Sequence, residues 1–232
     1  DQTFEKCDDI LHRQVYLGQG RQEGLLVYVE VAVSNLMLEE HVIGLSDVQP
    51  LKSYAEGKAA LLAGNGLLFL DGDTNCYKIS SKGYPGLGVK KAENEKVIRG
   101  SQEAFTESEK INVALIRKRL RDSRMKVEEQ TVGVRSHTMT ALVYMEDLIY
   151  QGLLTTMKQQ LQRYEIDGIL DSGMLEQLSE KHWLSPFPQF QTTERPDRAA
   201  AAVLEGRIVL VTDHSPQVLI LPSDYNSFFQ TS

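Results

Sequence analysis

Side chains suited to bind a small polar molecule gather in the run from Thr193 to Arg198. Arg195 stands between two carboxylates, Glu194 and Asp197, just before a helix whose first residue is expected to be Pro196. In a recognition site, the guanidinium would bind a carboxylate of the ligand and Glu194 would bind an ammonium group. The same spacing also fits a structural role, in which Arg195 binds a neighbouring carboxylate through two hydrogen bonds and holds the loop.

A basic run is the second candidate surface. Its cations, set against the single acid Asp122, are Arg117, Lys118, Arg119, Arg121, Arg124 and Lys126. The macrodipole stabilises cations at the C-terminal end of a helix, and acidic surfaces of the same chain can pair with them. An anionic lipid surface or an acidic partner subunit would also accept them. Nucleic acid is disfavoured as a partner, because no aromatic residues alternate with the cations and the net charge is −7.

Motifs for catalysis or metal binding do not stand out. Asp71, Asp73 and Asn75 imitate the start of a calcium-binding EF-hand loop, but Cys76 and Lys82 occupy the positions that require Gly and Glu. The five histidines are scattered without the spacing of metal ligands. No nucleophile elbow, zinc-protease motif or phosphate-binding loop occurs in the sequence. The sequence therefore predicts neither an enzyme nor a bound metal or other cofactor.

Composition is that of a soluble globular protein. The chain has 232 residues, of which 41% are hydrophobic. Its longest apolar stretch, Leu25 to Leu38, contains Glu30 and is too short to span a bilayer. The first residues lack the positive charge of a secretory signal, so none is expected. Cys7 and Cys76 are expected to be free thiols.

An internal repeat organises the chain. The segment from Leu25 to Glu30 matches the segment from Ala141 to Glu146 at four of six positions, and a turn at Gly18 or Gly133 precedes each. Each copy therefore predicts a β-hairpin.

A second pair of segments, residues 58–79 and 198–221, repeats in the same order. In both, a helix of small residues ends at a glycine, Gly64 or Gly206, that suits the position after a helix C-cap. A buried strand, a polar turn and a returning strand follow. The second copy is longer, mostly between Ile166 and Phe190.

These repeats predict an α/β fold with mixed sheets, as two α/β lobes of similar build joined by a connecting helix. The first lobe is expected at residues 1–90, the connector at 91–125 and the second lobe at 126–232. In the connector, Thr106 and Glu109 fit a capping box that would start a helix. An apolar stripe on this helix could pack against a lobe; its members are Ile111, Ala114, Leu115, Ile116 and Leu120.

Three stretches resemble the A subunits of GerA-type spore germinant receptors. They are Val97 to Ser108 together with Asn112 to Arg119, then Ser185 to Pro188 together with Thr193 to Asp197, and last Leu204 to Asp213. The family pattern in the connector reads Arg-Gly-Pro-Arg-Glu-Gly-Phe-Thr-Glu. This chain follows it at Arg99 but departs from it at Ser101, Gln102 and Ala104. The stretch from Glu194 to Asp197 matches the family unaltered, and the first lobe matches more loosely.

The resemblance implies a subunit of a complex with B and C subunits in the inner membrane of dormant spores. Such A subunits carry a large soluble N-terminal region followed by a membrane-spanning bundle. This chain is expected to be only the soluble region, anchored through a segment that it lacks. Self-association of A subunits is a further partner that the resemblance allows.

Two functions are compatible with this resemblance. The domain could act in receptor assembly and signal coupling during germination, which the sequence favours because few polar groups converge on one pocket. Alternatively, it could bind an amino acid or sugar germinant between its lobes, like a two-lobed solute-binding domain. The candidate ligand-binding residues are Arg99, Arg117, Glu194, Arg195 and Asp197.

Overall fold

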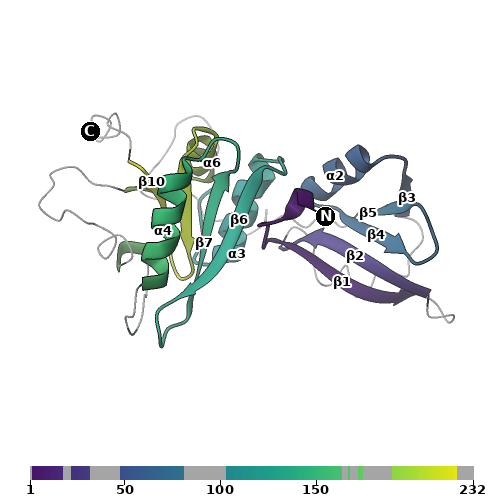
Figure 1. Ribbon diagram of the computed structural model, residues 1–232, viewed down its shortest axis with the longest axis horizontal. Coiled ribbons are helices and arrows are strands. Elements are labelled where there is room, and N and C mark those ends of the chain that lie inside the picture. Colours follow the sequence, from purple (N-terminus) through teal and green to yellow (C-terminus); the bar gives the residue numbers. More distant parts are fainter. Residues whose placement is uncertain are drawn as a thin grey trace, which may run out of the picture.

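Two lobes lie side by side with the N-terminal segment between them (Figure 1). The computed structural model describes residues 2–17, 22–31, 48–80, 103–163, 167, 172–174 and 190–223. Each lobe is built on a five-stranded sheet with helices packed against it. The expected α/β fold with two lobes of similar build is confirmed. Among the described residues, no helix is long and apolar enough to cross a membrane.

Among its described residues, the first lobe has a sheet in the order β1-β2-β4-β5-β3 with one helix packed on it. The helix is α2 (Tyr54–Leu62). A short 3-10 helix, η1 (Gln2–Phe4), precedes the lobe. The strands are β1 (Ile10–Leu17), β2 (Gln22–Val29), β3 (Val48–Leu51), β4 (Gly66–Leu70) and β5 (Cys76–Ile79).

The second lobe has the strand order β6-β7-β9-β10-β8. Its strands are β6 (Met125–Val132), β7 (Thr138–Met145), β8 (Gln191–Thr193), β9 (Ile208–Thr212) and β10 (Val218–Leu221). The described helices that cover it are α3 (Glu109–Arg119), α4 (Gln151–Arg163) and α6 (Pro196–Leu204). The eight described strand pairs of both sheets are antiparallel rather than mixed, and hairpins supply four of them.

The repeat extends to the register of the strands. One row of residues crosses each sheet at the same place, with Leu26 opposite Leu68, Leu68 opposite Tyr77 and Tyr77 opposite Pro50. The matching row of the second sheet pairs Leu142 with Leu210, Leu210 with Leu219 and Leu219 with Thr192. Helices α2 and α6 precede equivalent strands, so the lobes share one topology. The predicted strands and helices of both copies are confirmed here.

Helix α3 belongs to the core of the second lobe. Its apolar side chains pack with those of α6 and of the sheet, as the predicted stripe requires; the cluster includes Val113, Leu115, Ile116, Leu120, Val143, Ala199, Val203 and Val211. The opposite face of the sheet packs against α4 through a second cluster that includes Leu142, Leu154, Met157, Leu161 and Leu210. The second sheet is therefore covered on both faces.

The predicted capping box at the start of α3 is wrong. The helix begins at Glu109, and its backbone N–H donates to Asp213 Oδ1 at 3.0 Å. Thr106 instead binds the Asn112 side chain, whose Oδ1 accepts from its N–H at 2.7 Å. The preceding Phe105 is held by a hydrogen bond from its N–H to the Glu194 carbonyl. The helix start is therefore set by residues distant in sequence, which a local capping pattern does not contain.

Both predicted helix-ending glycines adopt the left-handed conformation. The φ angle is 85° at Gly64 and 79° at Gly206. Gly206 has a second constraint, because a Cβ there would lie 2.7 Å from the Leu148 carbonyl oxygen. Gly72, in the β4–β5 turn, has a φ of 78° but open space around it.

Replacement of Gly206 by Ala is expected to destabilise the second lobe more than an equivalent change elsewhere. Gly206→Ala should cost at least about 2 kcal/mol, since it combines a strained φ with a backbone clash. Gly72→Ala is the matched control and should cost about 1 kcal/mol, from φ alone. Urea unfolding followed by circular dichroism measures both. Equal losses in the two variants would contradict the role of the Leu148 contact.

Candidate functional site at the junction of the lobes

The N-terminal segment joins the two lobes by adding to the edge of the second sheet. Strand β6 is an edge strand of that sheet. Its Val127 donates to the Lys6 carbonyl at 3.0 Å and accepts from the Asp8 N–H at 2.9 Å. The same segment continues into β1, the edge strand of the first sheet. Residues 6–9 therefore form a backbone link between the edges of the two sheets.

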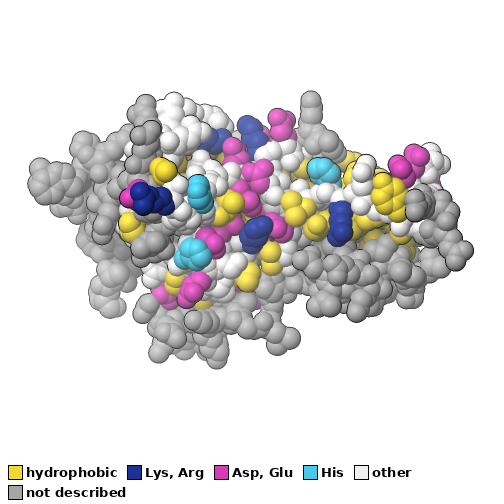
Figure 2. Space-filling view, turned by 90° about the horizontal axis from the view of Figure 1, so that it is seen from below, with side chains coloured by type: hydrophobic (Ala, Val, Ile, Leu, Met, Phe, Trp, Pro, Cys, Tyr) yellow, Lys and Arg dark blue, Asp and Glu magenta, His cyan; other side chains and the backbone are white. Residues whose placement is uncertain are grey.

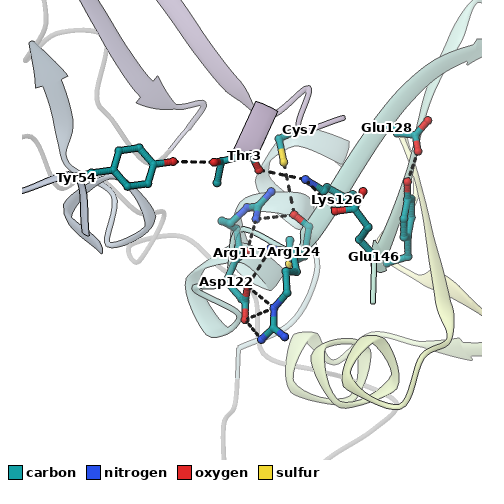
Figure 3. A network of polar contacts seen from close by, with 11 residues as sticks. Thr3, Cys7, Tyr54, Arg117, Asp122, Arg124, Lys126, Glu128 and Glu146 are labelled. Atoms are coloured by element: carbon teal, nitrogen blue, oxygen red, sulfur yellow. Dashed lines mark hydrogen bonds and ion pairs between the residues drawn. The ribbon is translucent and has the colours of Figure 1, made fainter. Parts of the chain in front are cut away.

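A buried ion pair fixes this link. The Arg117 guanidinium on α3 donates from Nε to Asp9 Oδ2 at 2.7 Å and from Nη2 to Asp9 Oδ1 at 2.8 Å. Its Nη1 donates to the backbone carbonyls of Asp122 and Met125, at 3.2 and 3.0 Å. The Arg117 side chain is fully buried, and that of Asp9 is 5% exposed. Figure 3 shows Arg117 among these contacts beside Cys7 and Asp122.

Further polar contacts surround the pair and reach both lobes (Figure 3). The buried Lys126 Nζ donates to the Thr3 carbonyl at 3.1 Å, and Tyr54 Oη of α2 donates to Thr3 Oγ1 at 2.7 Å. Lys110 on α3 pairs with Glu30 at the end of β2, at 2.6 Å. Helix α3, predicted as the connecting helix, thus packs with the second lobe and meets the first through its charged side chains.

Both cysteines are free thiols, as the sequence predicted. Cys7 Sγ lies 3.6 Å from the Met125 carbonyl oxygen, to which it donates. Burial raises the pKa of the Cys7 and Cys76 thiols above the usual value. Raised pKa values keep both groups in the less reactive protonated form.

An acidic cluster lies beside the junction. Glu109 is buried, with 1% exposure, and neither of its carboxylate oxygens has a hydrogen-bond partner. Burial, together with the nearby charges of Glu129, Asp213 and Glu30, raises its pKa to about 8, although Lys110 opposes the shift. Burial also raises the pKa of Glu129. Figure 2 shows acidic side chains gathered across the middle of the face that it draws, with Lys and Arg side chains among them.

The residues nominated from the sequence do not form one site. Arg117 forms the buried ion pair with Asp9. Arg195 binds Asp197 through two hydrogen bonds, from Nε at 3.2 Å and Nη2 at 2.5 Å, which is the structural role that the spacing allowed. Glu194 is buried and accepts a hydrogen bond from Gln217 at 3.2 Å. Arg99 lies outside the described residues.

The basic run is engaged largely by acidic groups of the same chain. Lys118 and Arg119 both pair with Glu103, at 2.8 and 2.7 Å. Arg124 pairs with Asp122 and with Asp147. Lys126 lies 3.4 Å from Glu146 and is 4% exposed. Intrachain pairing, one of the two explanations that the sequence left open, therefore accounts for these cations.

A cavity in the first lobe was missed by the sequence reasoning. Its volume is about 820 Å³, and it lies between α2 and the face of the first sheet. Its apolar lining includes Leu25, Val27, Leu61, Leu67 and Phe69. The continuous apolar runs Leu25–Val29 of β2 and Leu67–Leu70 of β4, in which alternate residues share one face of the sheet, were the signal that could have located this face.

Comparisons with known proteins decide the family. A model of the Bacillus/Clostridium GerA spore germination protein family matches residues 38–232. This chain belongs to that family. The resemblance to germinant-receptor A subunits expected from the sequence is thereby confirmed.

Relatives of this GerA-family chain include spore germination proteins of several bacilli. Spore germination protein KA of Bacillus subtilis (strain 168) is 34% identical over 192 residues, which cover 83% of this chain and 35% of the relative. Spore germination protein GerLA of Bacillus cereus is 32% identical over 202 residues, which cover 87% of this chain and 41% of the relative. The uncharacterized membrane protein YfkQ of Bacillus subtilis (strain 168) is 32% identical over 250 residues, which cover 98% and 48%. The chain thus spans about half the length of these relatives or less.

A solved structure has the same fold. The crystal structure of the N-terminal domain of the A subunit of the Bacillus megaterium spore germinant receptor GerK3 matches with a TM-score of 0.71. The match covers 97% of this GerA-family chain and 92% of the GerK3 chain, at 25% sequence identity.

Removal of Asp9 is expected to destabilise the domain strongly. Asp9→Ala leaves the Arg117 charge buried without a counter-ion, which should lower the free energy of unfolding by about 3–5 kcal/mol. Asp147→Ala is the control, because it removes an exposed partner of Arg124 and should cost no more than about 1 kcal/mol. Guanidinium unfolding of the two variants measures the difference. A loss in Asp9→Ala no larger than in Asp147→Ala would contradict this role.

The buried Glu109 should make stability fall as the pH rises. Its pKa is raised from 4.5 to about 8, so between these values the folded chain holds a proton that the unfolded chain has lost. The free energy of unfolding should therefore decrease across this window, by an amount on the order of a few kcal/mol. Glu109→Gln mimics the neutral acid and should lessen the decrease.

Thermal unfolding of wild type and Glu109→Gln between pH 5 and about pH 8 measures this effect. Glu107→Gln, at an exposed position of the same segment, is the matched control and should follow the wild type. If Glu109→Gln lost stability with pH as steeply as Glu107→Gln, Glu109 would not be the titrating group.

Proposed function

We propose that this domain acts in receptor assembly and signal coupling during spore germination, as part of a germinant-receptor A subunit. Family membership and the likeness to the GerK3 A-subunit domain support the receptor context. No catalytic step enters this function. The proposed partners are B and C receptor subunits, with self-association of A subunits as a further contact. The proposed location of the full-length subunit is the inner membrane of the spore.

The coupling role rests on one observation, the buried Arg117–Asp9 pair between the lobes. Both charges are removed from water. Separating Arg117 from Asp9 would leave each charge buried without its counter-ion, which is strongly unfavourable. The backbone link at Val127 adds directional hydrogen bonds to the same junction. A displacement of one lobe by a neighbouring subunit would therefore move the other lobe with it, as a rigid coupling element requires.

Direct binding of an amino acid or sugar germinant has less support. Such ligands need several converging polar groups. Arg117 is already paired with Asp9, and Arg195 is already paired with Asp197. The cavity beside α2 is lined mainly by apolar side chains, with Lys52 and Lys58 among its polar members. This chemistry does not match a zwitterion or a sugar.

The exposed Lys110–Glu30 pair offers a test of coupling that spares the core. The two singly reversed variants, Lys110→Glu and Glu30→Lys, place like charges across the junction, and the double variant restores attraction. In spores carrying the full-length subunit, each single variant should slow nutrient-triggered germination, and the double variant should recover toward wild type. The amount of receptor in spore membranes is measured alongside, since coupling is tested only at equal amounts.

Germination rates that are the same in both single variants and the wild type would contradict the coupling role. A double variant slower than either single variant would also contradict it. Nutrient binding measured on the isolated domain provides the contrast with the alternative, because saturable binding of an amino acid or sugar would favour direct sensing.

A further inference from the structure

We propose that the apolar groove between α2 and the first sheet receives an amphipathic helix of a partner polypeptide in the receptor. The groove is the cavity of about 820 Å³ described above. This inference deepens the proposed function and rests on it, since the partner is a component of the assembled receptor. It is carried by the internal repeat, which shows what covers the same surface in the second lobe.

The groove has a counterpart in the second lobe, residue by residue. The strand registers align Leu25 and Val27 of β2 with Ala141 and Val143 of β7, and Leu67 and Phe69 of β4 with Val209 and Val211 of β9. The shared helix alignment places Leu61 of α2 at the position of Val203 of α6. These five second-lobe residues all belong to the core cluster that contains the apolar side chains of α3. The surface that α3 covers in the second lobe is thus the surface that forms the groove in the first.

Exposure differs between the counterparts as a missing helix would require. Ala141 and Val211 are fully buried under α3. Leu25 and Phe69, their first-lobe counterparts, are 38% and 40% exposed. Large apolar side chains exposed side by side on a sheet face are typical of a binding surface.

The position that would receive the start of the helix is also repeated. Asp213 holds the first N–H of α3 and follows strand β9, where its own N–H donates to Met139 of β7 at 2.9 Å. Asp71 stands at the same place after β4, and its N–H donates to Glu23 of β2 at 2.9 Å. The Asp71 carboxylate is therefore placed to accept a hydrogen bond from a helix N-terminus, as Asp213 does.

The lining defines the chemistry of the incoming helix. Leu25 and Phe69 are larger than Ala141 and Val211, so a helix seated here needs smaller apolar side chains than the Leu115 and Ile116 of α3. Small residues such as Ala, Gly and Val at a spacing of three and four would fill the space. Lys52 and Lys58 at the rim favour acidic residues beside this stripe.

A photo-crosslinker at the groove tests the proposal in the assembled receptor. Benzoylphenylalanine replaces Phe69 in the full-length subunit, and the captured peptide is identified by mass spectrometry after irradiation of spore membranes. The expected product joins position 69 to a segment of another kind of polypeptide with small apolar residues at helical spacing. Benzoylphenylalanine at Leu204, an exposed apolar residue at the end of α6, is the control and should not capture that segment.

A substitution measures what the contact contributes. Phe69→Glu should reduce recovery of the captured partner with the A subunit by about tenfold or more, whereas Leu204→Glu should leave it unchanged. Circular dichroism of the isolated domain shows whether each variant is folded. If Phe69→Glu is unfolded, the milder Phe69→Ser replaces it.

Several results would overturn the groove proposal. They are capture of a small molecule, of a lipid, of this chain or a second copy of it, capture of no segment at position 69, and unchanged partner recovery in the folded Phe69 variant. The Lys110 and Glu30 variants separate this failure from that of the proposed function. If the Lys110 and Glu30 variants alter germination but position 69 captures no helix, the groove proposal alone is overturned. If position 69 captures a helix but these variants leave germination unaltered, the coupling role alone is overturned.

Discussion

The buried pairing of Arg117 with Asp9 is the constraint on which the arrangement of the two lobes depends. Arg117 lies on a helix of the second lobe, and Asp9 precedes the first strand of the first lobe. The guanidinium is satisfied only when the carboxylate and the carbonyls of Asp122 and Met125 surround it. A buried ion pair of this kind contributes geometry more than stability, since its desolvation offsets much of its attraction. It therefore specifies where the N-terminal segment must lie.

The two lobes share one topology, but the faces of their sheets are covered differently. In the second lobe, α3 and α4 cover both sides of the sheet and close two apolar cores. In the first lobe, the side that carries α2 keeps a cavity at the counterpart of the α3 site. The segment before β1 pairs at Cys7 with Val127 of β6 in the other lobe. The N-terminal segment thus joins the lobes at the edge of the second sheet, and the groove lies in the first lobe.

Features encoded locally could be predicted from the sequence. The hairpins, the strands after Gly64 and Gly206 and the helix start at Pro196 depend on a few neighbouring residues, and all were located. The start of α3 was misplaced, because Asp213 reaches it from a distant turn. The role of Arg117 was beyond sequence reasoning for the same reason, since Asp9 is its partner only in the folded chain. The role of Arg195 could be decided only from the structure, because its spacing in the sequence fitted both ligand recognition and a local ion pair.

Amide hydrogen exchange at Asp8 and Val127, whose N–H groups form the backbone link between the lobes, tests the central claim most directly. If the buried pair locks the lobes together, both amides should exchange as slowly as those of the interior strand β7 in the native domain. They should lose this protection selectively in Asp9→Ala, while β7 keeps its own. Fast exchange of both amides in the native domain, beside a fully protected β7, would contradict the account, because the lobes would then separate without unfolding.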